Sequence, residues 1–374
     1  MAQQFPLFTT VYGINLLAMS KQVLPPPPPN QPQVVPLEEN SWEFTTKQLS
    51  GANLACKLAA ALNIGLDILE SASGRAALAA LGNLVVQEWH RTPEFRFAGD
   101  VSYMNAYVDH FLFALRKEFP NVVIENLGGP EVLAATRRLP KGQWNGDLWA
   151  YRPKSSVGLY FNSGRVEDMK RAAADSKMAL RYKHFMFMFG CATSHELCHS
   201  FVAYLSQNSA DDFGYTPPNV SHLNYGETLR AQGSLRTRSG ESGRWFENKL
   251  FGGSLEFYED PRLDSGQVGV AYVLDEEDVA WKIKADAIVS LVQNAKEPQV
   301  PFERVYAGIT GDDRRRRGLR SLGSTSANSR RQVSQSYMRA AMAPVSHRFM
   351  HNVPRSKLVL FALDPRAVRA VAAR

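Results

Sequence analysis

The chain has 374 residues, of which 44% are apolar and 21% charged. This composition excludes a fibrous or wholly disordered protein, and the length is sufficient for one large core or two smaller ones. The net charge of +7 is unevenly distributed, because residues 301–374 hold 15 Lys and Arg but only 4 Asp and Glu. The basic character therefore belongs to the C-terminal part, and residues 1–300 carry a small excess of acidic groups.

The cysteines and the N-terminal segment indicate in which cellular compartment the protein is expected. Cys56, Cys191 and Cys198 are an odd and sparse set, and two of them fall on one predicted helix, so we expect no disulfide framework. A reducing intracellular location, cytoplasmic or nuclear, fits best. The first 21 residues lack a basic n-region and a small-residue cleavage site, and no stretch approaches about 18 uninterrupted apolar residues. We expect neither a signal peptide nor a membrane span.

A proline-rich stretch separates the N-terminal segment from the rest. Residues 23–36 contain seven prolines in fourteen positions, which favours an extended polyproline spacer over a packed element. A docking ligand for a proline-binding module is the alternative. We expect an extended or disordered segment over 1–40, a folded domain over 41–300 and a basic, partly disordered extension over 301–374.

The elements of the domain follow from its apolar periodicity. Residues 51–91 predict two Ala- and Leu-rich helices that are broken around 71–74, and residues 102–119 predict a third helix. Short strands are expected at 121–127 and 156–162, and a long helical stretch at 166–207. The predicted class is α+β, mainly helical, with a small mixed sheet before the helical stretch at 166–207.

The helical stretch at 166–207 contains the sequence His-Glu-Leu-Cys-His at residues 195–199. On an α-helix, His195 and His199 project from one face, one turn apart, so both imidazoles can bind a single metal ion. Glu196 is rotated by about 100° from His195, which places its carboxylate near water bound to such an ion. This is the geometry of a zinc hydrolase with two histidine ligands and a carboxylate general base.

The flanks of the motif support the metal interpretation. They are apolar, so the motif is expected in the interior, where an unpaired Glu beside two His would be costly to bury. The alternative is that the histidines are ordinary core residues and Glu196 faces solvent. Cys191 and Cys198 lie near the same face, and packing is favoured over zinc ligation for both.

A catalytic zinc needs a third protein ligand and an open position. Residues 240–253 predict a helix that ends at Gly252, with Glu241 near its start. Glu241 is the favoured ligand and Glu247 the alternate; they are separated by roughly 120° around the axis, so only one is expected to face the ion. Glu227 and His222 are more distant alternatives.

The pattern resembles the gluzincin branch of the zincin metallopeptidases, in which HExxH is followed by a ligand Glu on a second helix. The segment 241–253 is similar to the Glu-containing helix of ImmA/IrrE-type zincins, HELCHSF is similar to SprT-like proteins, and both motifs resemble uncharacterised, mostly fungal, zincin-like proteins. The resemblance covers roughly residues 156–260. The chain departs from gluzincins at Trp245, where they have Asp, and from metzincins at Val202 and Leu205, where those have Gly and a third His.

The resemblance implies a zincin-like fold and hydrolysis of a peptide or protein substrate. Zn²⁺ would be held by His195, His199 and Glu241, and Glu196 would carry a proton from water to the leaving amine. It also implies that the substrate pairs with an edge strand before the metal helix, here residues 158–162. An ordinary inner strand is the alternative for this segment.

The sequence also offers candidates for an oxyanion-stabilising donor and for a second binding surface. Tyr258 is the candidate donor, with Tyr225 and His222 as further ones, although each also suits a structural role. The Arg-rich segment 314–331 is interpreted as solvated, with a weak nucleic-acid contact as the alternative. Two other functions compete with the peptidase: a catalytically silent zincin-like binding protein, and a metal-dependent amide hydrolase or cyclase acting on a small metabolite.

Overall fold

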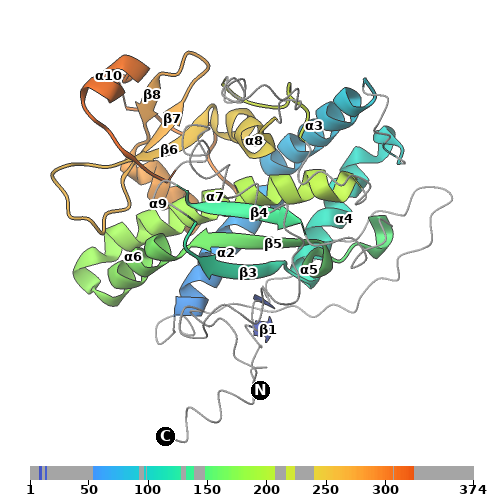
Figure 1. Cartoon of the computed structure of the whole chain (residues 1–374), viewed down its shortest axis with the longest axis horizontal. Coiled ribbons are helices and arrows are strands. Elements are labelled where there is room, and N and C mark those ends of the chain that lie inside the picture. Colours follow the sequence, from blue (N-terminus) through green and yellow to red (C-terminus); the bar gives the residue numbers. More distant parts are fainter. Residues whose placement is uncertain are drawn as a thin grey trace, which may run out of the picture.

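The computed structural model describes residues 8–10, 13–14, 54–91, 97, 99–127, 132–138, 148–206, 216–223, 240–305 and 307–323. These residues form a mixed α+β fold in which helices pack with two small sheets (Figure 1). The expected fold class is therefore confirmed at the level of α+β.

The predicted helices are present, and the structure adds three short helices that were not predicted, at 153–156, 285–293 and 311–316. Ser71 separates the first two, and its hydroxyl accepts a hydrogen bond from the backbone N–H of Gly74, which caps the second. A short 3-10 turn, Ser176–Met178, interrupts the long helical stretch. The helices are α2 (Leu54–Glu70), α3 (Ala72–Trp89), α4 (Met104–Lys117), α5 (Pro153–Ser156), α6 (Ser163–Ala174), α7 (Ala179–Leu205), α8 (Ser242–Phe251), α9 (Ala285–Gln293) and α10 (Gly311–Arg316).

The first sheet has the strand order β1-β2-β3-β5-β4. Strand β5 runs parallel to β3 and antiparallel to β4, so it is hydrogen-bonded on both sides. Among the strands that the structure describes, β4 is an edge strand. The bounds are β1 (Phe8–Thr10), β2 (Gly13–Ile14), β3 (Asn121–Glu125), β4 (Ala134–Arg138) and β5 (Val157–Asn162).

The second sheet was not expected from the sequence. It has the order β8-β7-β6-β9, with antiparallel pairing throughout. Strand β6 follows α8 after a turn at Gly252, whose φ of 80° is one that glycine adopts without strain. The bounds are β6 (Ser254–Tyr258), β7 (Val270–Leu274), β8 (Ala280–Lys282) and β9 (Ser321–Gly323).

Helix α7 is the centre of the core. From Phe185 to Leu205 every residue is buried except Ala192 and His199, which are partly exposed. Helix α2 crosses α7 at two glycines, because a Cβ on Gly65 would meet Thr193 at 2.5 Å and one on Gly190 would meet Ile64 at 2.6 Å. Figure 1 shows α7 between β4 on one side and α8 on the other. The most buried helix therefore carries the His-Glu-Leu-Cys-His sequence.

The described parts of the expected terminal segments join the fold. Strand β2 pairs with β3 through Gly13 and Asn121, and β9 pairs with β6. The proline-rich stretch 23–36 lies outside the described residues, as do residues 324–374. In the described part of the chain, no helix combines the length and apolar character that a bilayer crossing requires.

Candidate metal centre

Helix α7 presents both histidines toward the start of α8. The two imidazole rings lie one turn apart, with centroids separated by 5.3 Å. The side chain of His195 is 1% exposed, whereas that of His199 is 15% exposed. Solvent therefore reaches the pair from the His199 side.

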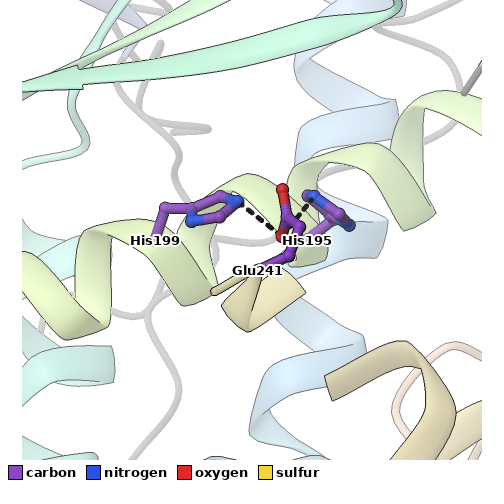
Figure 2. Close-up of side chains that lie close together, drawn as sticks. All are labelled: His195, His199 and Glu241. Carbon is purple, nitrogen blue, oxygen red and sulfur yellow. Dashed lines mark ion pairs between the residues drawn. The ribbon is translucent and has the colours of Figure 1, made fainter. Parts of the chain in front are cut away.

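Glu241 completes the cluster as the N-cap of α8. Its Oε2 accepts hydrogen bonds from the backbone N–H groups of Gly243 (3.1 Å) and Arg244 (3.4 Å), which fixes the carboxylate at the positive end of the helix dipole. The same oxygen lies 3.1 Å from Nε2 of His199 and 3.5 Å from Nε2 of His195. Figure 2 shows both imidazoles directed at this carboxylate.

These three side chains form a group with the spacing of a metal site. One ligand atom from each of His195, His199 and Glu241 lies within 4.8 Å of the others. Two imidazole nitrogens and one carboxylate oxygen are the donor set of many catalytic zinc sites. The structure therefore brings together the three residues that the sequence analysis selected as ligands, and they could hold a metal ion.

Each imidazole is also held through its second nitrogen. Nδ1 of His195 lies 2.8 Å from Oε1 of Glu247, and Nδ1 of His199 lies 2.9 Å from Oγ of Ser242. A carboxylate oxygen only accepts hydrogen bonds, so the Nδ1 of His195 must carry the proton. The neutral tautomer of His195 then has its lone pair on Nε2, the nitrogen that faces Glu241.

The electrostatics of the cluster favour a bound cation. Burial disfavours the charged form of His195, but the negative charges of Glu247 and Glu241 outweigh this effect and raise its pKa to about 10. Nε2 of His195 is buried and lies 3.5 Å from Oε2 of Glu241, but it makes no well-aligned hydrogen bond with the residues that the structure describes. A dication between the Nε2 atoms and Glu241 would balance the charges of the two carboxylates.

Glu196 differs from Glu241 and Glu247 in the partners of its carboxylate. Glu196 is only 3% exposed, yet its carboxylate makes no hydrogen bond or ion pair with the described residues. Its backbone carbonyl accepts a hydrogen bond of 2.8 Å from Oγ1 of Thr136, which ties this part of α7 to β4. The carboxylate is thus the one acidic group of the motif and of α8 without a structural partner in the described part of the chain.

The strand that was expected to pair with substrate is an inner strand and not an edge strand. Residues 158–162 belong to β5, which is hydrogen-bonded to β3 and to β4 and has no free edge. The amide of Asn162 bonds the carbonyl of Leu133, so in the antiparallel ladder Ala134 and Thr136 direct their N–H and C=O groups away from β5. Within the described residues, the free edge beside α7 is therefore that of β4.

Among the described residues, those that were predicted as oxyanion donors or as alternative ligands do not join the group of His195, His199 and Glu241. Tyr258 is at the far end of β6, where its ring packs on Tyr272 at 5.5 Å and under Arg314, in a second hydrophobic cluster separate from the metal site. Its expected role as an oxyanion donor is not supported by this position. His222 bonds Oγ of Ser254 at 2.7 Å and is not part of the metal group. Glu227 and Tyr225 fall outside the described residues.

The buried cysteines are packing residues. Cys191 and Cys198 are not members of the metal group, and Sγ of Cys198 donates to the carbonyl of Ser194. Burial raises the pKa of both thiols well above the ordinary value. Their place outside the group of His195, His199 and Glu241 fits the packing role predicted for them.

The Arg-rich segment is largely neutralised where it is described. Arg314 pairs with Asp278, and Arg315 and Arg316 pair with Asp312 and Asp313 one turn earlier on α10. Arg320 pairs with Glu259. These ion pairs support the solvated interpretation over a phosphate-binding one for residues 314–320, and residues 324–331 lie outside the described part.

Sequence reasoning missed two supporting residues at the start of α8. Ser242 is the partner of His199, and Gly243 lies against the ring of His195, where a Cβ would meet three ring atoms at 2.4 Å. The signal was present, because Ser and Gly follow directly after the candidate ligand Glu241. A glycine in the first turn of a helix indicates close approach of another group.

No family model, curated protein or solved structure that was compared with this chain matches it.

Proposed function

We propose that this chain is a zinc-dependent hydrolase of peptide bonds with a zincin-like fold. One observation carries the proposal: the Nε2 atoms of His195 and His199 converge on Glu241 in a buried site, while both Nδ1 atoms are bound to other partners. A pair of core histidines without a metal would not need both nitrogens directed in this way. The donor set of two imidazoles and a carboxylate fits zinc.

The side chains of the site have separate tasks in this proposal. His195, His199 and Glu241 would hold the ion. A zinc ion supplies Lewis acidity, which makes water more acidic and a carbonyl more electrophilic near neutral pH. Glu196, whose carboxylate has no partner among the described residues, would accept the proton of the attacking water and deliver it to the departing amine nitrogen.

The edge of β4 supports a peptide as the substrate. The outward N–H and C=O groups of Ala134 and Thr136 provide donors and acceptors for an extended chain, as in strand addition. Oγ1 of Thr136 is bonded to the backbone of Glu196, so this edge lies beside the proposed general base. A peptide paired with β4 would therefore run past the metal site.

The proposal is tested by metal content and cleavage together. The full chain is purified, its zinc is measured by elemental analysis, and cleavage of a peptide library is followed by mass spectrometry with and without a chelator. We expect about one zinc per chain, and cleavage that a chelator abolishes and added zinc restores. A chain that binds no zinc contradicts the proposal.

Two further outcomes would favour the competing functions. Stoichiometric zinc without cleavage of any peptide or amide would favour a catalytically silent binding protein. Hydrolysis of small amides alone would favour the metal-dependent amide hydrolase or cyclase, because the same site chemistry is not restricted to peptides.

A further inference from the structure

We infer that Glu247 is a positioning residue that fixes the orientation and raises the donor strength of His195, and that it does so through a bridge to the second sheet. This inference rests on the proposed zinc site. It concerns a residue that the sequence analysis considered only as an alternative ligand.

The first step is the contact of Glu247 with the imidazole. Its Oε1 lies 2.8 Å from Nδ1 of His195, on the side of the ring opposite to Glu241. A carboxylate in this position stabilises the tautomer with the lone pair on Nε2 and makes that nitrogen a stronger donor. Glu247 thus acts on the ion through His195 rather than as a ligand.

The second step is the other oxygen of the same carboxylate. Oε2 of Glu247 accepts a hydrogen bond of 3.0 Å from the backbone N–H of Leu255 in β6. Both oxygens are therefore used by two different donors, and the side chain is 6% exposed. Only a carboxylate offers two acceptors here, because a glutamine in this place would direct an N–H group at one of the two donors.

The third step is the difference between the two histidines. His199 has the neutral hydroxyl of Ser242 as its partner, and that hydroxyl also accepts a hydrogen bond of 3.5 Å from Oγ1 of Thr216. A charged partner strengthens a hydrogen bond about twofold over a neutral one. The support of His195 should therefore matter more to metal affinity than the support of His199.

Glu256 provides a matched control for Glu247. It is also a buried glutamate that joins α8 to β6, since its Oε1 lies 2.9 Å from a guanidinium nitrogen of Arg244, but it does not contact either imidazole. Loss of Glu256 removes an anchor between the same helix and the same strand. A purely structural role of Glu247 would make the two substitutions equivalent for zinc binding.

The experiment compares Glu247→Gln, Glu256→Gln and the unchanged chain. Zinc dissociation constants are measured by competition with a chromophoric chelator, Co²⁺-loaded samples are recorded by visible absorption, and thermal unfolding is followed in the metal-free state. We expect Glu247→Gln to weaken zinc binding about 10–100-fold and to shift the Co²⁺ bands. Glu256→Gln should lower the unfolding temperature but leave zinc affinity within about threefold of the unchanged chain and the Co²⁺ bands in place.

The outcomes separate this inference from the proposed function. If the unchanged chain binds no zinc, the proposed function fails. If the unchanged chain binds zinc and Glu247→Gln binds it equally well, or if Glu256→Gln weakens binding as much as Glu247→Gln does, the positioning role of Glu247 is overturned. Should Glu247→Gln not fold, Ser242→Ala gives the second measurement, with an expected loss of zinc affinity below about tenfold; a larger loss would contradict the ranking of the two histidines.

Discussion

Glu196 is buried beside the metal group, yet its carboxylate has no hydrogen-bond or ion-pair partner in the described part of the chain. We expect Glu196→Gln to retain zinc, because the ligands are unchanged, and to lower kcat about 100- to 10,000-fold, because the amide cannot accept a proton. The measurement is kcat on a cleaved peptide together with zinc content. Glu167→Gln, on the exposed face of α6, is the control and should keep full activity. An active Glu196→Gln enzyme would remove Glu196 from the mechanism.

At the scale of elements, the first turn of α8 packs directly against the imidazole of His195. Gly243 lies so close to His195 that an added Cβ would meet its ring atoms at 2.4 Å. We expect Gly243→Ala to push the imidazole aside, to lower the free energy of unfolding by about 1–3 kcal/mol and to weaken zinc binding about 10–100-fold.

Calorimetric zinc titration and chemical denaturation measure these two effects. Gly266→Ala is the matched control, because its nearest neighbour would lie 3.4 Å from the added Cβ, an ordinary contact. Unchanged zinc affinity in Gly243→Ala would show that the ring tolerates displacement.

The same helix shows how far the sequence predicts the site. The bounds of α8 and its end at Gly252 follow from local signals, and the i,i+4 spacing predicts that His195 and His199 share a face. The contact of Glu247 with His195 could not be predicted in this way. Its angle around the helix separates it from Glu241, but only the packing of α8 on α7 brings it to Nδ1 of His195.

The strands were harder to predict than the helices. β4 has the sequence Ala-Ala-Thr-Arg-Arg, in which Thr136 is the only β-branched residue and no residue is aromatic, so its edge was missed and β5 was assigned in its place. Whether a strand is inner or edge depends on partners that are distant in sequence. By contrast, β7 is the apolar run Val-Ala-Tyr-Val-Leu directly after Gly269, and β6 alternates polar and apolar residues directly after Gly253, so a signal was available for the second sheet.

At the scale of the whole molecule, a bound ion would link α7 to α8 inside the core and so stabilise the native state. A ligand present at 100 times its Kd adds about 2.7 kcal/mol to the free energy of unfolding. For a domain of this size, this corresponds to an increase in Tm of about 5–10 °C. Differential scanning calorimetry with zinc and with a chelator measures the shift, and His199→Ala should show none. An equal Tm in both conditions would contradict a metal at this position.

The raised pKa of His195 predicts how the molecule responds to pH. In the metal-free protein the folded pKa of about 10 exceeds the ordinary value of 6.5, so the stabilisation from protonated His195 is fully present below about pH 6.5 and is lost as the pH rises through about 10. Zinc must displace this proton, because the ligand is the neutral imidazole. Metal-free and zinc-bound proteins should therefore respond to pH in opposite directions.

Isothermal titration of the metal-free chain with zinc between pH 6.5 and 8.5 tests this response. In two buffers that differ in ionisation enthalpy, we expect the release of about one proton from His195 per zinc and an affinity that rises up to about tenfold per pH unit. The increase in Tm on adding zinc should grow over the same range, because the metal-free fold loses stability while zinc binding gains it. Binding without proton release would mean that His195 is already neutral, and that Glu241 and Glu247 do not hold a proton on its ring before the metal arrives.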